Sequence, residues 1–402
     1  MILAWIVVAL TALVALIWFA LTARLGFIMR RERFLKPVQG PVPTLAEAET
    51  TAIDLIVAAH NEEREIEACV RSLLAQDYPS LRITVVNDQS TDATGAILDR
   101  LASEARAGGG HPLRIVQGVE RPEGWLGKTW ALQQGLEGIE ADWLLFVDGD
   151  MKLHPKAVLT AFQAGQDTGA DLVSILPGVR CESFWQKVAA IELSLMISHI
   201  YPLARINNQN RPEALAAGGF LMVRRELYEG VGGHEAVRRE IVEDIQLARR
   251  IKGAGGRLLV KGAPDLASTH MYGTLGEIWR GLRKNAYAGM EYQIYKYVTG
   301  AIGAIWLAWT PLLALIWGLA QGFGESGLTT APLIAVGLLG ILAQATAAAP
   351  FVWALRLPIA YAFSLPVGIS LYVAIASSSV WHHRRGRILW KDRQFSTQTL
   401  RS

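Results

Sequence analysis

The chain has 402 residues, of which 51% are apolar and 19% are charged, and its formal net charge is +3. This composition excludes a disordered chain, and the mild charge argues against a nucleic-acid partner. The two cysteines, Cys69 and Cys181, exclude a disulfide-rich scaffold and have no metal-ligand spacing. The length allows two domains, and the apolar residues are concentrated near the two ends of the chain.

Residues 1–23 form an uncharged apolar run that is long enough to cross a hydrocarbon core of about 30 Å. A cleaved signal peptide is the alternative, but no basic segment precedes the run, which also exceeds the usual apolar length. Residues 24–51 form a basic linker with Arg24, Arg30, Arg31, Arg33 and Lys36. Positive residues that flank a first span stay in the cytoplasm, and they suit the anionic headgroups of a bilayer. We therefore expect a multi-pass protein of the inner cell membrane with a cytoplasmic domain.

Residues 52–273 have the composition of a soluble domain in which strands and helices alternate. Apolar runs predict strands at 53–59, 81–86, 113–117 and 143–147, with helices at 62–75, 91–104 and 129–136 between them. This succession predicts an α/β domain with a mostly parallel sheet. Ligands of such open sheets bind beyond the carboxyl ends of the strands, which is where the polar motifs of this domain occur.

Two carboxylates, Asp148 and Asp150, follow the fourth predicted strand, and Gly149 allows a tight turn between them. Alternation along an extended chain places both carboxylates on the same side of the backbone. Mg²⁺ is commonly shared between one or two carboxylates and substrate phosphates, and Mn²⁺ accepts the same oxygen ligands. The pattern predicts Mg²⁺ or Mn²⁺ bridged to a nucleotide diphosphate, with a simple turn as the alternative.

Further polar residues lie after the first two predicted strands and before a predicted helix. Asn61 and Glu62 come after the first strand, and Asp88 comes after the second, where its carboxylate can accept from a base or a ribose hydroxyl. Lys128 precedes a helix within the glycine-containing residues 124–129, and a helix N-terminus with a lysine suits phosphate oxygens. The alternatives are a turn role for Asp88 and a solvated surface position for Lys128.

Two motifs lie later in the domain. Gly218 and Gly219 form a small-residue turn into a strand, which can press the backbone against a ligand. Glu243 and Asp244 open a helix that continues to about residue 252. Acids in a first helical turn are often only partners of the helix dipole. The functional interpretation is that Asp244 acts as a general base.

The C-terminal third is mostly apolar. Residues 274–297 mix aromatic rings with cations, which predicts an interfacial amphipathic segment. Residues 298–381 contain apolar runs at 298–320, 331–355 and 357–381, which predict two to three transmembrane helices. The tail, 382–402, is basic, which favours the cytoplasm, whereas three spans place it outside. Either the charge rule fails here or one segment, most simply the proline-containing last one, is re-entrant or interfacial.

Residues 184–204 form another mostly apolar stretch, but it includes Lys187, Glu192 and His199. A full membrane span is therefore not expected. The stretch is either a core helix or an interfacial helix that guides a membrane acceptor toward the site.

Taken together, the motifs after residues 53–59, 81–86 and 143–147 and the Glu243-Asp244 pair resemble family 2 inverting glycosyltransferases of the GT-A fold, over about residues 52–290. The resemblance implies that Asp88 contacts the base or ribose, that Asp148 and Asp150 hold the metal, and that Asp244 is the base with Glu243 beside it. Asn61, Glu62, Lys128, Gly218 and Gly219 become candidate donor-binding residues.

The segments 124–129 and 390–393 are similar to those of the membrane-bound, lipid-glycosylating branch, in particular the hopene-associated and carotenoid glycosyltransferases. Ceramide glucosyltransferases share the layout. Their Gln/Arg-x-x-Arg-Trp motif is only partly present, as Glu277-Ile278-Trp279-Arg280-Gly281, so Arg280 remains a candidate substrate contact. The expected activity is transfer of a sugar from a nucleotide-diphosphate donor to a membrane lipid of hopanoid, carotenoid or ceramide type. A polysaccharide synthase subunit and a non-catalytic nucleotide-sugar-binding membrane protein are the alternatives.

Overall fold

The computed structural model describes residues 2–31, 34–39, 51–270, 272–290, 292–322, 328–385, 388–390 and 393–395. Internal contacts divide the chain into two units. The globular unit contains the described residues of Glu32–Arg180 and Leu203–Met271, and the helical unit contains those of Met1–Arg31, Cys181–Pro202 and Tyr272–Thr397. Residues 40–50 of the predicted basic linker and much of the predicted basic tail lie outside the described residues. The domain boundaries expected from the sequence stay predictions.

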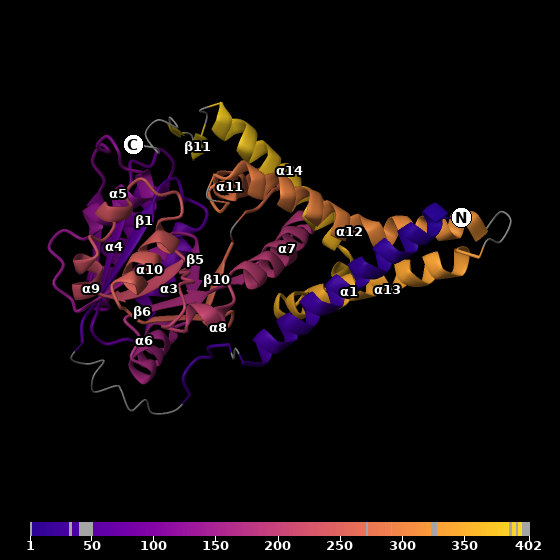
Figure 1. The fold of residues 1–402 in the computed structure, drawn as a ribbon. Coiled ribbons are helices and arrows are strands. Elements are labelled where there is room, and N and C mark those ends of the chain that lie inside the picture. The colour runs from indigo at the N-terminus through magenta and orange to yellow at the C-terminus, as the bar shows by residue number, and fades with distance from the viewer. Residues whose placement is uncertain are drawn as a thin grey trace. The chain divides into compact units, whose positions relative to one another are not determined.

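The globular unit is built on a seven-stranded sheet with helices packed around it (Figure 1). The strand order is β3-β2-β1-β4-β8-β6-β9. The strands are β1 (Ile53–Ala59), β2 (Leu81–Asn87), β3 (Leu113–Gln117), β4 (Trp143–Asp148), β6 (Leu172–Leu176), β8 (Phe220–Arg224) and β9 (Leu258–Gly262). The first four in the order are parallel, β8 is antiparallel to both neighbours, and β6 pairs with β9 in parallel. The expectation of a mostly parallel α/β sheet is confirmed.

Strand register brings the polar motifs to one edge of this sheet. Ala59 pairs with Asn87, and Ala58 pairs with Asp148. The residues that follow β1, β2 and β4 therefore emerge side by side at the carboxyl ends of the strands. A second sheet continues from this edge, with β5 (Met151–Leu153) antiparallel to β10 (Ala267–Thr269), which pairs in parallel with β7 (Gly178–Val179).

The globular unit has the helices α3 (Ile66–Leu74), α4 (Thr94–Gly108), α5 (Gly127–Gly135), α6 (Ala157–Thr168), α8 (Leu203–Ile206), α9 (Arg225–Gly230) and α10 (Glu243–Gly253), and the 3₁₀ helix η1 (Glu235–Val237). α3 begins four residues after the expected start, because the amides of Glu65 and Ile66 first close a turn on the Glu62 carbonyl. α4 begins three residues late, because the Asp92 side chain accepts from the Thr94 amide at 3.0 Å. Both delays leave a polar loop at the sheet edge.

The core forms from the alternating apolar positions of the central strands, including Leu55, Val57 and Leu145, and from the buried face of α3. Burial of such side chains is the main stabilising contribution to the unit. α5 lies close to the sheet because Gly135 has no side chain: a Cβ there would lie 2.5 Å from the Ile56 Cγ2 atom. The tight packing of Gly135 fixes the position of Lys128 at the start of the same helix.

The helical unit contains α1 (Ile2–Arg31), α7 (Phe184–Ile200), α11 (Leu275–Ala286), α12 (Ile294–Gly322), α13 (Thr330–Ala354) and α14 (Leu365–Arg384), with the 3₁₀ helix η2 (Ile359–Phe363) and the short strands β11 (Ile388–Trp390) and β12 (Arg393–Phe395). Within the part of the chain that the structure describes, four helices are long and apolar enough to cross a membrane: Ile2–Phe27, Ile294–Gln321, Thr330–Ala354 and Leu365–Arg384. α1, α12 and α13 pack against one another (Figure 1). The last helix begins eight residues later than expected, because η2 and Pro366 delay its start.

The apolar stretch after residue 183 forms α7, whose start carries a capping box between Ser183 and Gln186. α7 packs on α13 and α14, and its Ile191 and Leu195 join the apolar cluster of the helical unit. The predicted interfacial segment 274–297 contains α11, a turn and the first residues of α12.

Candidate active site

The loops after β1 and β2 hold each other in place. Asn61 has a φ of 52°, a backbone conformation that asparagine adopts more readily than most residues, and its side chain accepts from the Thr91 amide at 2.8 Å. The amide of Glu62 donates to the Thr94 hydroxyl at 2.8 Å. Asn61 therefore has an architectural role in this loop pair, and its predicted contact with a substrate stays a prediction.

Asp88 lies where β2 ends and is buried, with 3% of its surface exposed. Its amide donates to the Ala59 carbonyl at 2.8 Å, which ties it to the end of β1. Gly118, after β3, leaves room beside the carboxylate: a Cβ there would lie 3.5 Å from Asp88 Oδ1. These contacts hold the main chain of Asp88 at the sheet edge, and its predicted contact with a base or ribose stays a prediction.

Asp148 ends β4, and Asp150 lies just before the start of β5. Asp150 Oδ2 accepts from the Thr269 hydroxyl at 2.7 Å, a contact made possible by the pairing of β5 with β10. Burial raises the pKa of Asp150 to about 6, and repulsion by Asp148 and Glu62 adds to the shift. Asp150 is therefore a buried carboxyl group whose charged form is disfavoured mainly by burial and further by its acidic neighbours.

This donor set fits a hard divalent cation, which binds carboxylate oxygens and relieves their mutual repulsion. Among the described residues no group of three or more histidine, cysteine, aspartate or glutamate side chains is close enough to enclose a metal by itself. A cation at Asp148 and Asp150 would therefore take its remaining ligands from a diphosphate or water, which is the usual arrangement for Mg²⁺.

Lys128 connects the metal-site candidate with the base candidate. Its Nζ lies 2.7 Å from Asp148 Oδ1 and 2.8 Å from Glu243 Oε1. Burial disfavours the charged amine, but the carboxylates of Asp148, Glu243 and Asp244 outweigh it and hold the pKa of Lys128 well above its usual value. The amine is therefore a permanent cation between acids that are far apart in the sequence, and it is not a surface lysine.

Asp244 is held by two main-chain amides at the start of α10. Its Oδ2 accepts from the Gly218 amide and its Oδ1 from the Ile245 amide, each at 2.8 Å. Burial raises the pKa of Asp244 to about 6, repulsion by Glu243 acts in the same direction, and Lys128 opposes both. A carboxylate with this pKa is ionised at neutral pH and is more basic than an exposed aspartate.

The two glycines before β8 have different surroundings. A Cβ on Gly218 would lie 2.8 Å from Lys128 Nζ and 3.2 Å from Asp244 Oδ2, so the absence of a side chain lets these groups meet. A Cβ on Gly219 would instead lie 3.0 Å from the Met151 sulfur. Gly219 therefore has a packing reason to be a glycine, and its predicted ligand contact stays a prediction. Arg280 lies on α11 in the helical unit, and its predicted role also stays a prediction.

Sequence reasoning missed two groups beside this site. Thr269 donates to Asp150, and only the β5–β10 pairing reveals it. His234 packs edge-on against Phe146 with ring centres 4.6 Å apart, and its Nδ1 lies 2.6 Å from the Tyr228 hydroxyl. Burial, with a smaller effect of Lys128, lowers the pKa of His234 to about 3, so the ring is neutral. No local pattern in the sequence indicates either contact.

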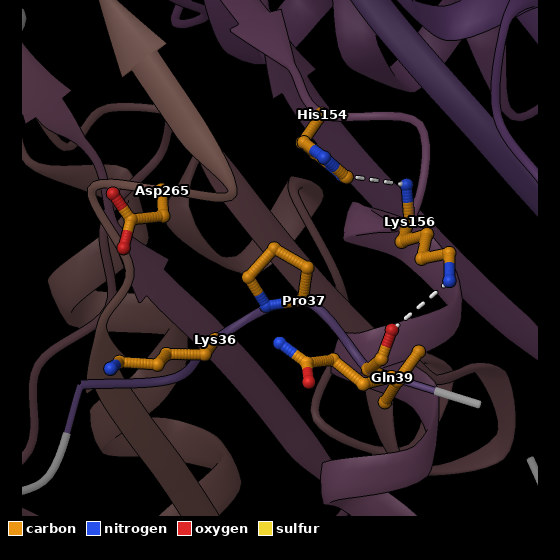
Figure 2. A pocket seen from close by; sticks show the side chains of 7 residues that line it. Lys36, Pro37, Gln39, His154, Lys156 and Asp265 are labelled. Atoms are coloured by element: carbon orange, nitrogen blue, oxygen red, sulfur yellow. Dashed lines mark hydrogen bonds between the residues drawn. The ribbon is translucent and has the colours of Figure 1, made fainter.

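A cavity of about 590 Å³ lies elsewhere in the globular unit (Figure 2). Its lining includes Lys36 and Pro37 from the segment after α1, together with His154, Lys156 and Asp265. Lys156 Nζ donates to the Val38 carbonyl at 3.1 Å, which anchors that segment. None of the acidic residues at the carboxyl ends of β1, β2 and β4 lines this cavity, so we place the candidate site at the sheet edge.

The strand order, with acidic residues at the carboxyl ends of the strands, is similar to that of the GT-A fold. A solved structure of similar fold is the mannosyltransferase PcManGT from Pyrobaculum calidifontis, determined in complex with GDP-Man and Mn²⁺. It is 20% identical, with a TM-score of 0.52 over 91% of this chain and 98% of that one. Residues 54–232 match the model of the family described as glycosyl transferase family 2. Glu243 and Asp244 lie just beyond the matched residues.

Curated relatives are similar over the same region. The 4,4'-diaponeurosporenoate glycosyltransferase of Staphylococcus aureus (strain USA300) is 28% identical over 199 residues, which is 49% of this chain and 50% of the relative. The protein of the same name from strain MRSA252 is 26% identical over 200 residues. The chain spans about half the length of the curated relatives it matches.

Proposed function

We propose that this protein transfers a sugar, with inversion of configuration, from a nucleotide-diphosphate donor to a membrane lipid. One observation carries the proposal: Lys128 joins Asp148 to Glu243 at 2.7 and 2.8 Å, beside Asp244 and the glycine at residue 218. A metal-binding carboxylate, a fixed cation and a candidate base thus meet at the sheet edge, where open α/β sheets bind their ligands.

The donor would lie across the carboxyl ends of β1, β2 and β4. In this proposal Asp88, buried at the end of β2, would contact the base or ribose, and Asp148 and Asp150 would hold Mg²⁺ or Mn²⁺ with the diphosphate. The structural relative PcManGT was solved with GDP-Man and Mn²⁺, which supports a donor and a metal of this kind. When bound, the metal supplies Lewis-acid stabilisation of the negative charge that develops on the leaving diphosphate.

The residues of this chain supply the other elements of the reaction. Asp244, ionised at neutral pH, takes the proton from the acceptor hydroxyl as that oxygen attacks the anomeric carbon. The Gly218 and Ile245 amides hold the carboxylate in one orientation. Lys128 places a fixed positive charge near the departing diphosphate, where it is most effective in the transition state.

The acceptor in this proposal is a lipid of hopanoid, carotenoid or ceramide type. Four helices suited to cross a membrane accompany the catalytic domain, and the curated relatives are named as diaponeurosporenoate glycosyltransferases. The protein would reside in the inner membrane with the globular unit in the cytoplasm, where nucleotide sugars are made. Arg280 on α11 is kept as a candidate substrate contact.

The test separates proton removal from donor binding. Asp244→Asn is expected to keep donor affinity and to lose about 10²- to 10⁴-fold in turnover, the range of general base catalysis. Glu243→Gln should be milder, and Asp88→Asn should weaken donor affinity. Mass spectrometry of lipids formed by the purified protein in bilayers identifies the product. Near-normal turnover of Asp244→Asn, or a defect confined to donor binding, would refute the assignment.

A further inference from the structure

Glu192 is a carboxyl group in the middle of the apolar helix α7. It is half-buried, and its Oε2 atom is buried with no hydrogen-bond partner among the described residues. Burial raises the pKa of Glu192 to about 8, so the carboxyl is neutral at neutral pH. Buried polar atoms are nearly always hydrogen-bonded, and each exception needs a physical explanation.

α14 packs closely against α7 at this position. A Cβ on Gly368 of α14 would lie 3.2 Å from the Cβ of Glu192 and 3.3 Å from Val188 Cγ1. Tyr372, four residues further along α14, lies on the same helical face as Gly368 and interacts electrostatically with Glu192 and Tyr201. Glu192 therefore lies in a close and mostly apolar contact between two helices.

His199 repeats this pattern on the same face of α7. It follows Glu192 by seven residues, which is two helical turns or about 10 Å. Its Nδ1 lies 2.9 Å from the Leu195 carbonyl, so that nitrogen carries the proton, and Nε2 is buried without a partner among the described residues. In the neutral ring Nε2 accepts hydrogen bonds. One face of α7 thus offers a neutral carboxyl, which donates and accepts, and an imidazole acceptor.

The chemistry of these groups selects a ligand class. An alcohol hydroxyl both donates and accepts, so it can pair with either group: with the neutral carboxyl in both directions, or with the imidazole nitrogen as a donor. A lipid carboxylate or phosphate would bring a negative charge toward a carboxyl in an apolar contact, which is unfavourable. We propose that the face of α7 that carries Glu192 and His199 binds the hydroxyl head of a neutral lipid alcohol. This inference rests on the proposed function in one respect: the bound alcohol is the class of acceptor that receives the sugar.

The experiment measures lipid capture directly. The full-length protein in lipid nanodiscs is irradiated with a photoactivatable C16 alcohol or with the matching C16 carboxylic acid, and the labelled peptides are identified by mass spectrometry. We expect the alcohol to label peptides of α7 and α14 at least about fivefold more than the acid does. Glu192→Gln keeps a donor and an acceptor and should label like the parent protein. Glu192→Leu should lose at least about fivefold, the order of one lost hydrogen bond.

Glu182→Leu is the matched control, because Glu182 is exposed just before α7, and its labelling should not change. Equal labelling of Glu192→Leu and the parent protein would overturn the inference. Equal loss in Glu192→Gln and Glu192→Leu would also overturn it, since that pattern indicates a packing role. Efficient labelling by the acid would refute the preference for an alcohol. Capture requires no sugar donor, so labelling tests this inference independently. If labelling is as expected but the same protein, supplied with donor and metal, glycosylates no lipid, the proposed function fails and this inference stands.

Discussion

Lys128 offers the sharpest test of the site, because its amine contacts both Asp148, a candidate metal ligand, and Glu243, the neighbour of the candidate base. Lys128→Met removes the cation and keeps most of the side-chain volume. Asp148 and Glu243 then lose their counter-ion, with 37% and 10% of their side chains exposed. Exposed ion pairs contribute about 0.2–1 kcal/mol, and removing one partner of a buried pair costs about 3–5 kcal/mol. This half-buried site should lie between these limits, at about 2 kcal/mol, which lowers Tm by about 4–8 °C for a unit of this size.

The same substitution should move the pH dependence of turnover. Asp244 must be ionised to accept a proton, so activity falls as the pH drops through its pKa of about 6. Lys128 lowers that pKa, and its removal should therefore shift the acid limb to higher pH. A shift of about one pH unit corresponds to about 1.4 kcal/mol of lost stabilisation of the carboxylate.

The assay is turnover at saturating donor from pH 4.5 to 8.5, together with thermal unfolding of the same preparations. Lys152→Met, at an exposed position on β5, is the matched control and should leave both curves unchanged. An acid limb that stays in place in Lys128→Met would show that the amine does not act on the base. Unchanged Tm would show that the two ion pairs contribute nothing to folding.

Three other predictions follow from the site and the chain. Gly218→Ala places a methyl 2.8 Å from Lys128 Nζ, so turnover should fall at least about tenfold, whereas Gly253→Ala, with open space around it, should be neutral in the same assay. EDTA should abolish turnover, and Mg²⁺ or Mn²⁺ should restore it. Asp150→Ala should stay folded but be inactive with either metal. Full activity in EDTA would contradict the metal assignment. Protease added to intact spheroplasts should leave residues 51–270 uncut, and cleavage there would reverse the proposed orientation.

Local sequence patterns determined the elements of the globular unit. Apolar runs bounded by polar residues predicted β1, β2, β3 and β4 to within a residue, because a buried strand in a parallel sheet must be apolar on both faces. Helix starts were less accurate: α3 and α4 began three or four residues late, since side-chain and main-chain hydrogen bonds in the preceding loops decide where the first turn closes.

The sequence also determined which residues gather at the carboxyl edge, because parallel strands deliver the residues that follow them to one side of the sheet. Asp88, Asp148 and Asp150 could be predicted on this ground alone. Hydropathy likewise indicated the apolar runs that form the helices suited to a membrane, but it left open whether two or three of the C-terminal ones span.

Only the tertiary structure decided which of these residues and helices contact one another. The insertion of β8 between β4 and β6 brings Gly218 beside Lys128, and the amine then bridges carboxylates 20 residues after it and 115 residues after it. The pairing of β5 with β10 delivers Thr269 to Asp150, and the packing of α7 on α13 and α14 places it in the helical unit. Such contacts depend on long-range strand pairing and helix packing, for which a local sequence period carries no information.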